Sequence, residues 1–369
     1  MATGGDARAD GTDPGARILA FDLARGLAVV FMILVHVMRH WGDPSTWTTP
    51  IGTVVSFLGG PPAAPVFMFL MGAVLAFSRR SSFGSLARRG LVLLAMGYAL
   101  NLTRGTIPLS LGMATGFVTA EEVAPFTPLS LFTTVDILQL AGCSLILMAV
   151  LRRFAPPGPA WLVVAAAAVV VAPALYGQTV GLPIADALLG LLWSSGTNVY
   201  YPVLPWVVFP LAGAVVGDMV VRASDRRALI RRIGLIGVVS AVLGTVLVAT
   251  VAPPLDDVTY WRLPPILLPG ILGFVAAWVW LCDVVVHRMD SLVDLGVVYG
   301  WSRRVTSMYV IHWLIVAWGV AFVGFRVLDL GPVLVAMVAV LVATIVVARW
   351  RPRLPRLTTP VETSPARSG

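Results

Sequence analysis

Long runs of apolar residues, separated by short polar segments, follow one another along most of the chain. A helix that crosses a bilayer needs roughly 20 mostly apolar residues, and most of these runs have about that length. Two shorter apolar pieces, 51–58 and 188–193, leave the number of crossings open by one. The pattern predicts an all-α, polytopic membrane helix bundle with about ten transmembrane helices, at 17–40, 60–78, 89–104, 128–151, 160–177, 201–221, 233–252, 264–287, 304–325 and 331–349.

Composition supports a lipid environment. The chain is 58% hydrophobic and 12% charged, with a mean hydropathy of +0.89, whereas soluble domains are about 45–50% apolar and about 25% charged. The polar start lacks the features of a cleaved signal peptide, so the first apolar run is expected to stay in the protein. We therefore expect a disordered cytoplasmic tail at 1–16, one transmembrane domain at 17–349 and a basic cytoplasmic tail at 350–369.

The positive charges indicate the orientation of the bundle. All 26 basic residues are arginines, and most lie at the two ends or in alternate loops, within 79–89, 152–153, 222–232 and 288–304. The opposite loops hold only Arg39, Arg104, Arg262 and Arg326. Because cytoplasmic loops carry the excess of arginine, both ends are expected inside. The net charge of +8 then faces anionic lipid and is no sign of nucleic-acid binding, which favours a multi-pass protein of the cell membrane, of the bacterial inner-membrane type.

The first span carries a line of ionisable residues. At 100° per residue, the side chains of Asp22, Arg25, His36, Arg39 and His40 fall within a stripe of about 100°. Charges inside a membrane are costly and usually functional, so this stripe is expected to face a protein interior or a wet cavity. Two structural interpretations stay open: an Asp22–Arg25 pair at i,i+3 that only fixes helix packing, and histidines that are merely hydrogen-bonded or interfacial.

Further polar residues lie in later spans. Asp136, with Gln139 three residues on, is placed near mid-membrane in the fourth span, where a lone carboxylate needs a partner such as Arg25. His312 and Tyr309 lie in the ninth span, within SMYVIHWLIV. Each of these groups could equally serve in helix packing. Prolines open the second and sixth spans, and such irregular backbone is permitted where it lines a cavity.

Several segments resemble one family of membrane enzymes. RILAFDLARGLAVVFMILVH resembles the opening motif of the membrane acyltransferase superfamily. APVFMFLMG, VDILQLAG, YPVLPWVVFPLAGAVVG and SMYVIHWLIV resemble later segments of its heparan-alpha-glucosaminide N-acetyltransferase-like branch, and the acyltransferase family three proteins are more distant relatives. The resemblance runs from Arg17 to about Leu314 in consistent order.

The resemblance implies a bundle of about ten helices with its N-terminus inside, in agreement with the arginine pattern. It also implies transfer of an acyl group, acetyl above all, from cytoplasmic acyl-CoA to a hydroxyl or amine of a sugar at the other face. By the resemblance, His36 is the functional histidine, with Asp22 and Arg25 organising the site. The sequence departs from the eukaryotic heparan enzyme in the first outside loop, which leaves His40 as the other candidate.

This chemistry needs a base for the attacking group and stabilisation of the developing oxyanion. His36 could supply the base, and Arg25, Arg303 and Arg304 could hold the phosphates of coenzyme A. A thioester donor requires no metal, and we expect none. The candidates for substrate binding are Arg39, Asp136, Gln139, Trp206, Tyr309 and His312.

Two other functions compete with the enzyme. A secondary transporter could use the buried Asp136 and His312 with the proline-interrupted second and sixth spans. A non-catalytic membrane partner would leave the polar stripe unexplained. Cys143 and Cys282 lie inside spans without metal-ligand spacing and are interpreted as packing residues. The sequence leaves open whether the protein forms a homo-oligomer.

Overall fold

The structure is a computed structural model that describes residues 18–78, 82–193, 196, 198–251, 257–289 and 295–350. The two predicted tails therefore lie almost entirely outside the described residues. Within these ranges the chain is helical, with two isolated β-bridges and no strand. The predicted all-α class is confirmed.

The long helices largely follow the predicted spans. Eight helical segments of the described residues are long and apolar enough to cross a membrane, at Leu19–Trp41, Pro50–Ala73, Ile137–Phe154, Val203–Arg222, Arg226–Val251, Pro265–Met289, Val305–Val323 and Leu330–Trp350. The two other predicted spans coincide with α5 (Phe83–Asn101) and with α9 (Pro159–Leu175), which is 17 residues long. The count of about ten crossings thus stays a prediction.

Three of these candidate spans contain more than one helix: Pro50–Ala73 contains α3 and α4, Val203–Arg222 contains α11 and α12, and Pro265–Met289 contains η2 and α15. The principal helices are α1 (Leu19–Trp41), α4 (Ala64–Ala73), α8 (Ile137–Phe154), α12 (Val208–Arg222), α13 (Arg226–Val251), α15 (Leu268–Met289), α17 (Val305–Val323) and α18 (Leu330–Trp350). The shorter elements are α2 (Pro44–Trp47), α3 (Pro50–Gly59), η1 (Leu102–Thr106), α6 (Ile107–Ala114), α7 (Pro128–Phe132), α10 (Pro183–Leu192), α11 (Val203–Trp206), α14 (Asp257–Arg262), η2 (Pro265–Leu267) and α16 (Gly296–Arg303).

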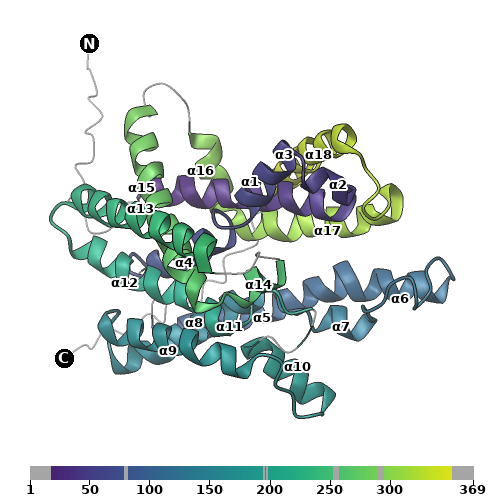
Figure 1. Ribbon diagram of the computed structural model, residues 1–369, viewed down its shortest axis with the longest axis horizontal. Helices are drawn as coiled ribbons and strands as arrows, with labels where there is room; N and C mark the ends of the chain where they lie inside the picture. Colours follow the sequence, from purple (N-terminus) through teal and green to yellow (C-terminus); the bar gives the residue numbers. More distant parts are fainter. Residues whose placement is uncertain are drawn as a thin grey trace, which may run out of the picture.

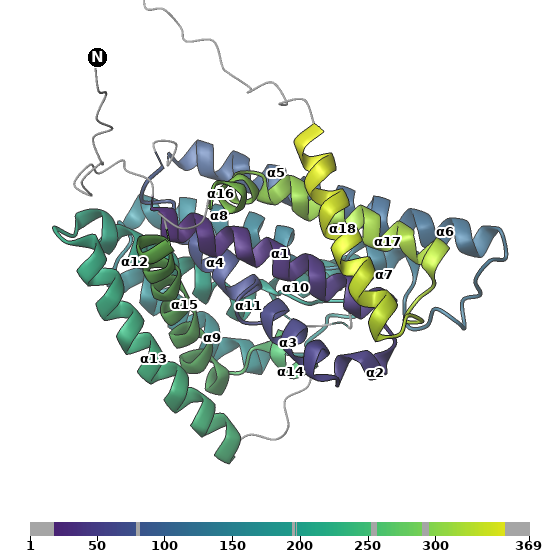
Figure 2. The same cartoon turned by 90° about the horizontal axis from the view of Figure 1, so that it is seen from above.

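Helix α1 lies in the middle of the bundle. It packs against α3, α4 and α15–α18 (Figures 1 and 2), and it contributes side chains to both hydrophobic clusters of the core. In its most apolar stretch 67% of the residues are buried, against 17% in α13. A helix surrounded by protein can carry polar groups away from lipid, whereas α13 exposes apolar side chains on the outside of the bundle.

Glycines let α4 and α12 approach backbone to backbone. A Cβ atom on Gly213 would lie 1.9 Å from the Phe69 carbonyl oxygen, and one on Gly72 would lie 1.9 Å from the Pro210 oxygen. Small residues permit such close contact between membrane helices, where the hydrophobic effect does not drive association. This pair supports α1 on one side.

Two predicted spans differ from the structure. The fourth, 128–151, is interrupted at 133–136, between α7 and α8. The break is stable because the Asn101 side chain donates to the carbonyl oxygens of Phe132 and Thr134, which a continuous helix would have bonded internally. The second candidate span begins earlier than predicted, since the segment long and apolar enough to cross is Pro50–Ala73, in which α3 and α4 are separated by a bend at 60–63.

Candidate functional site

Two histidines from α1 and α17 form a stacked pair. His36 Nδ1 lies 2.9 Å from His312 Nε2, and the two rings are nearly parallel, at 2°. His312 Nδ1 donates to the Met308 carbonyl oxygen, 3.0 Å away. A neutral imidazole carries one hydrogen, so His312 Nε2 accepts from His36 Nδ1. This arrangement leaves the Nε2 atom of His36 unprotonated and basic.

His40 stands one turn beyond His36 on the same helix. Its Nδ1 donates to the His36 carbonyl oxygen at 3.0 Å, and its ring meets that of His36 edge to face. Three of the four histidines of the chain therefore gather in one place. The fourth, His287, lies at the far end of α15 and is bonded to the Asp283 carbonyl oxygen.

The Trp313 ring contacts both the histidine rings and the Arg104 guanidinium. Its ring centroid lies 4.1 Å from that of His36 and 5.2 Å from that of His40. The Arg104 guanidinium carbon lies 4.0 Å from the centre of the Trp313 ring system, a short cation–π distance. Arg104 thus belongs to the same cluster as the histidines, although it comes from η1.

Arg104 forms a buried ion pair with Asp136. The Arg104 Nη2 atom lies 2.7 Å from Asp136 Oδ2, and both side chains are 9% exposed. The expected Arg25–Asp136 pair is wrong, because Arg25 lies in the N-terminal half of α1 and pairs with Asp22. The predicted place of Asp136 inside a helix is also wrong, because Asp136 is the N-cap of α8 and accepts from the Ile137 amide.

Three more polar side chains border this ion pair. Gln139 Oε1 accepts from the Asp136 amide, which completes a capping box. The Tyr309 hydroxyl lies beside Asp136 and Trp313. Burial raises the pKa of Tyr200, and the neighbouring Asp136 carboxylate raises it further. The structure therefore brings four of the predicted substrate-binding residues to the histidine pair: Asp136, Gln139, Tyr309 and His312.

The two remaining substrate-binding candidates lie elsewhere. Trp206 is fully buried among Tyr201, Phe209 and Tyr260, and its indole donates to the Trp261 carbonyl oxygen. These contacts make it a packing residue of α11. Arg39 lies with its guanidinium carbon 4.6 Å from the Trp47 ring.

The N-terminal half of α1 carries a second polar cluster. Arg25 Nη2 donates to Asp22 Oδ1 at 2.8 Å, and Arg25 Nε donates to the Ser302 hydroxyl at 2.8 Å. That hydroxyl donates to Asp22 Oδ1 at 2.6 Å. The predicted i,i+3 pair therefore exists, and Ser302 extends it into a link between α1 and α16.

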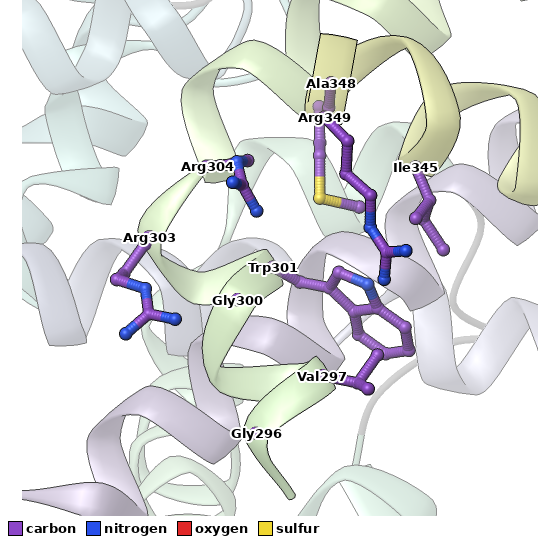
Figure 3. A pocket seen from close by; sticks show the side chains of 10 residues that line it. Gly296, Val297, Gly300, Trp301, Arg303, Arg304, Ile345, Ala348 and Arg349 are labelled. Atoms are coloured by element: carbon purple, nitrogen blue, oxygen red, sulfur yellow. The ribbon is translucent and has the colours of Figure 1, made fainter. Parts of the chain in front are cut away.

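A pocket opens near this cluster. It has a volume of about 250 Å³ and is formed by α16, the start of α17 and the end of α18. Arg303 and Arg304 come from the end of α16, and Arg349 reaches in from α18 beside Trp301 (Figure 3). Two of the predicted phosphate-binding arginines thus line one pocket, which has the cationic and aromatic groups that suit a nucleotide or another phosphate.

The sequence interpretation missed Arg104, Trp313, Ser302, Trp301 and Arg349 as site residues. Arg104 offered one signal, because it is one of few arginines outside the arginine-rich loops. The other four gave none, since a tryptophan or serine in an apolar segment and an arginine at a helix end are common.

The helices and the polar interior define a multi-pass membrane protein. The sequence profile of the heparan-alpha-glucosaminide N-acetyltransferase catalytic domain matches residues 17–245, and the chain belongs to this family. It is accordingly a membrane acetyltransferase. No individual curated protein matches it in a sequence comparison. The match includes His36, Arg104 and Asp136, whereas His312 and the arginine pocket lie beyond it.

Within the described residues no group of His, Cys, Asp and Glu side chains has the arrangement of a metal site. Cys143 and Cys282 are both free thiols.

Proposed function

We propose that the protein transfers an acetyl group from cytoplasmic acetyl-CoA to a hydroxyl or amine of a sugar at the opposite face of the cell membrane. The stacked His36–His312 pair, in a member of an acetyltransferase family, is the observation that carries this proposal. A base at that place is what acyl transfer to a sugar needs. The buried polar cluster around it gives the attacking group a setting away from lipid.

The arginine pocket is the proposed donor site. Arg303, Arg304 and Arg349 present guanidinium groups that bind phosphate through paired hydrogen bonds. Arg304 precedes His312 by eight residues on α17, which is roughly 12 Å along the helix axis. An extended pantetheine arm can cover that distance, so the thioester would reach the histidines while the phosphates stay at the cytoplasmic end. Arg25 lies beside this route, linked to α16 through Ser302.

His36 is the proposed general base. Its Nε2 atom takes the proton of the acceptor hydroxyl or amine, whose oxygen or nitrogen attacks the thioester carbonyl carbon. The carbon–sulfur bond then breaks, and the coenzyme A thiolate takes up the proton that His36 received. His312 holds the ring of His36 through the Nδ1–Nε2 hydrogen bond. His40, Asp136, Gln139 and Tyr309 are proposed to bind or orient the acceptor.

The test measures thiol release. Purified protein in detergent is given acetyl-CoA with a panel of amino sugars and neutral sugars, and free coenzyme A and acetylated sugar are quantified. We expect stoichiometric formation of both, and loss of both in His36→Ala and His312→Ala. His287→Ala is the matched control, since His287 is 42% exposed at the other end of the bundle.

The transporter interpretation makes a different prediction in the same experiment. If no sugar of the panel releases thiol, and reconstituted protein instead moves protons across a liposome membrane in response to a solute, acetyl transfer is refuted. The family match favours the enzyme. Light scattering of the same sample gives the oligomeric state.

A further inference from the structure

Arg104 is presented by an irregular turn. The helical stretch from α5 to α6 contains the π-helix η1 at Leu102–Thr106, in which the Ile107 amide bonds to the Leu102 carbonyl oxygen. The Trp318 indole donates to the Thr103 carbonyl oxygen at 2.9 Å, and the Thr106 hydroxyl donates to the Pro128 carbonyl oxygen at 3.1 Å. Single π-turns inside α-helices occur frequently at functional sites. Here side chains of α17 and of η1 itself bond to neighbouring carbonyl groups and hold the turn that carries Arg104.

The Arg104 guanidinium makes hydrogen bonds along one edge and packs on an aromatic ring with one face. Its Nη2 atom bonds to Asp136 Oδ2 at 2.7 Å and to Asn101 Oδ1 at 3.2 Å, while its face lies on Trp313. Its Nη1 atom is buried and has no hydrogen-bond partner among the described residues. The Tyr309 hydroxyl and the Trp313 indole nitrogen are likewise buried without a hydrogen bond of regular geometry. Buried donors without partners are costly, so a ligand atom that accepts from them would stabilise the site.

The net charge of the Arg104–Asp136 pair indicates which kind of ligand atom would accept a hydrogen bond there. Asp136 already neutralises Arg104, so the pair as a whole has little attraction for a fully charged carboxylate or phosphate. A neutral carbonyl oxygen that becomes negative during reaction matches it better, because fixed donors favour charge that develops in the transition state.

Building on the proposed function, we propose that Arg104 Nη1 donates a hydrogen bond to the thioester carbonyl oxygen of the acetyl donor and stabilises the oxyanion. As the acceptor attacks the carbonyl carbon, the π electrons move onto that oxygen. They return when the carbon–sulfur bond breaks. Arg104 keeps its proton throughout, and Asp136 with Asn101 fixes its orientation.

Arg104→Lys separates this role from a structural one. Lysine keeps the charge that pairs with Asp136 but lacks the second arm of the guanidinium. We expect kcat to fall by about 10²–10³-fold, the KM for acetyl-CoA to change little, and the apparent melting temperature in detergent to stay close to that of the wild type. Arg153→Lys is the matched control, because Arg153 also stacks on an aromatic ring, that of Phe83, at the opposite end of α8 from Asp136.

Infrared spectroscopy reads the hydrogen bond directly. Acetyl-CoA carrying a ¹³C label at the thioester carbonyl is bound to the wild-type protein, and its carbonyl stretching band is compared with that in solution. We expect a lower frequency in the wild type and loss of this shift in Arg104→Lys. A band in the wild type that is not lowered overturns the proposal even if the variant fails to fold.

The other outcomes of these experiments would each overturn the proposed role of Arg104. Normal turnover by Arg104→Lys would overturn the role of Arg104 and leave the proposed function intact. A fall in stability, with kcat restored once the protein is kept folded at low temperature, would make the ion pair a structural link only. Absence of thiol release by the wild type would refute the proposed function and this inference together.

Discussion

The structure contains two aspartate–arginine pairs of almost the same length and quite different setting, one on α1 and one between η1 and α8. In the N-terminal half of α1, Asp22 and Arg25 are 2.8 Å apart on one helix, and Arg25 is 23% exposed. In the other pair, Asp136 and Arg104 are 2.7 Å apart, join α8 to η1 and are each 9% exposed. Ion-pair distance alone therefore says little about the role of a pair. Burial and sequence separation decide what depends on it.

The largest expected effect on activity is that of a substitution at His36, in the C-terminal half of α1. His36→Ala removes the proposed base, and kcat should fall by about 10²–10⁴-fold, with normal membrane insertion and an unchanged elution profile in detergent. The measurement is acetyl-CoA-dependent acetylation of the best acceptor of the panel. Full activity in this variant would transfer the role of base to His40 and make the His36–His312 pair a structural contact.

The second effect compares the two ion pairs directly. Asp136→Asn keeps an N-cap acceptor for α8 but leaves the Arg104 charge buried and unpaired, which should cost about 3–5 kcal/mol of unfolding free energy. Asp22→Asn affects a pair that is partly exposed, and about 1–2 kcal/mol is expected. Chemical unfolding in detergent, followed by tryptophan fluorescence, measures both. Equal losses would show that burial does not distinguish the pairs.

A third effect concerns the donor pocket. Arg304→Gln should remove one charge-assisted hydrogen bond to a phosphate, worth about 1.5–3 kcal/mol, so the KM for acetyl-CoA should rise at least about tenfold with kcat little changed. Arg288→Gln is the control, because Arg288 is exposed at the end of α15 outside the pocket. A change in kcat without a change in KM would contradict donor binding at this pocket.

The smallest effect tests the link between α1 and α16. Ser302→Ala deletes a hydroxyl that donates to Asp22 and accepts from Arg25, and about 1 kcal/mol of stability should be lost. The unfolding experiment above detects this change. A loss as large as that of Asp136→Asn would mean that the cluster around Asp22, as much as that around Asp136, holds the bundle together.

The comparison also explains what could be predicted. Hydropathy predicted the long apolar helices well because each apolar run is a local property, and the i,i+3 spacing predicted the Asp22–Arg25 pair for the same reason. The partner of Asp136 could not be found in this way, since Arg104 lies 32 residues away in the sequence. The break at 133–136 was missed because its short polar stretch lies between two apolar segments that together have the length of one span. The Asn101 side chain that stabilises the break comes from another helix.

His36 and His312 were each singled out, but their contact was not. Nothing along the sequence shows that α17 places His312 against the polar stripe of α1. The stripe did show correctly that this face of α1 is turned away from lipid. Periodicity thus identified the faces of helices, and the packing of helices far apart in sequence determined which faces meet.

The length of the helical path from α5 through η1 has a consequence for how large the acetyl acceptor can be. Arg104 follows Phe83, where α5 begins, by a helical path of roughly 30 Å, which is about the thickness of the hydrocarbon layer. On the predicted topology, Arg104 would then lie toward the outer boundary of the lipid, and the pantetheine arm would extend toward it from the cytoplasmic pocket. On the proposed function, a bulky glycan chain could present one hydroxyl from outside without entering the bilayer. Only a two-carbon unit would have to cross the membrane, while both large reactants stay in the compartments from which they came.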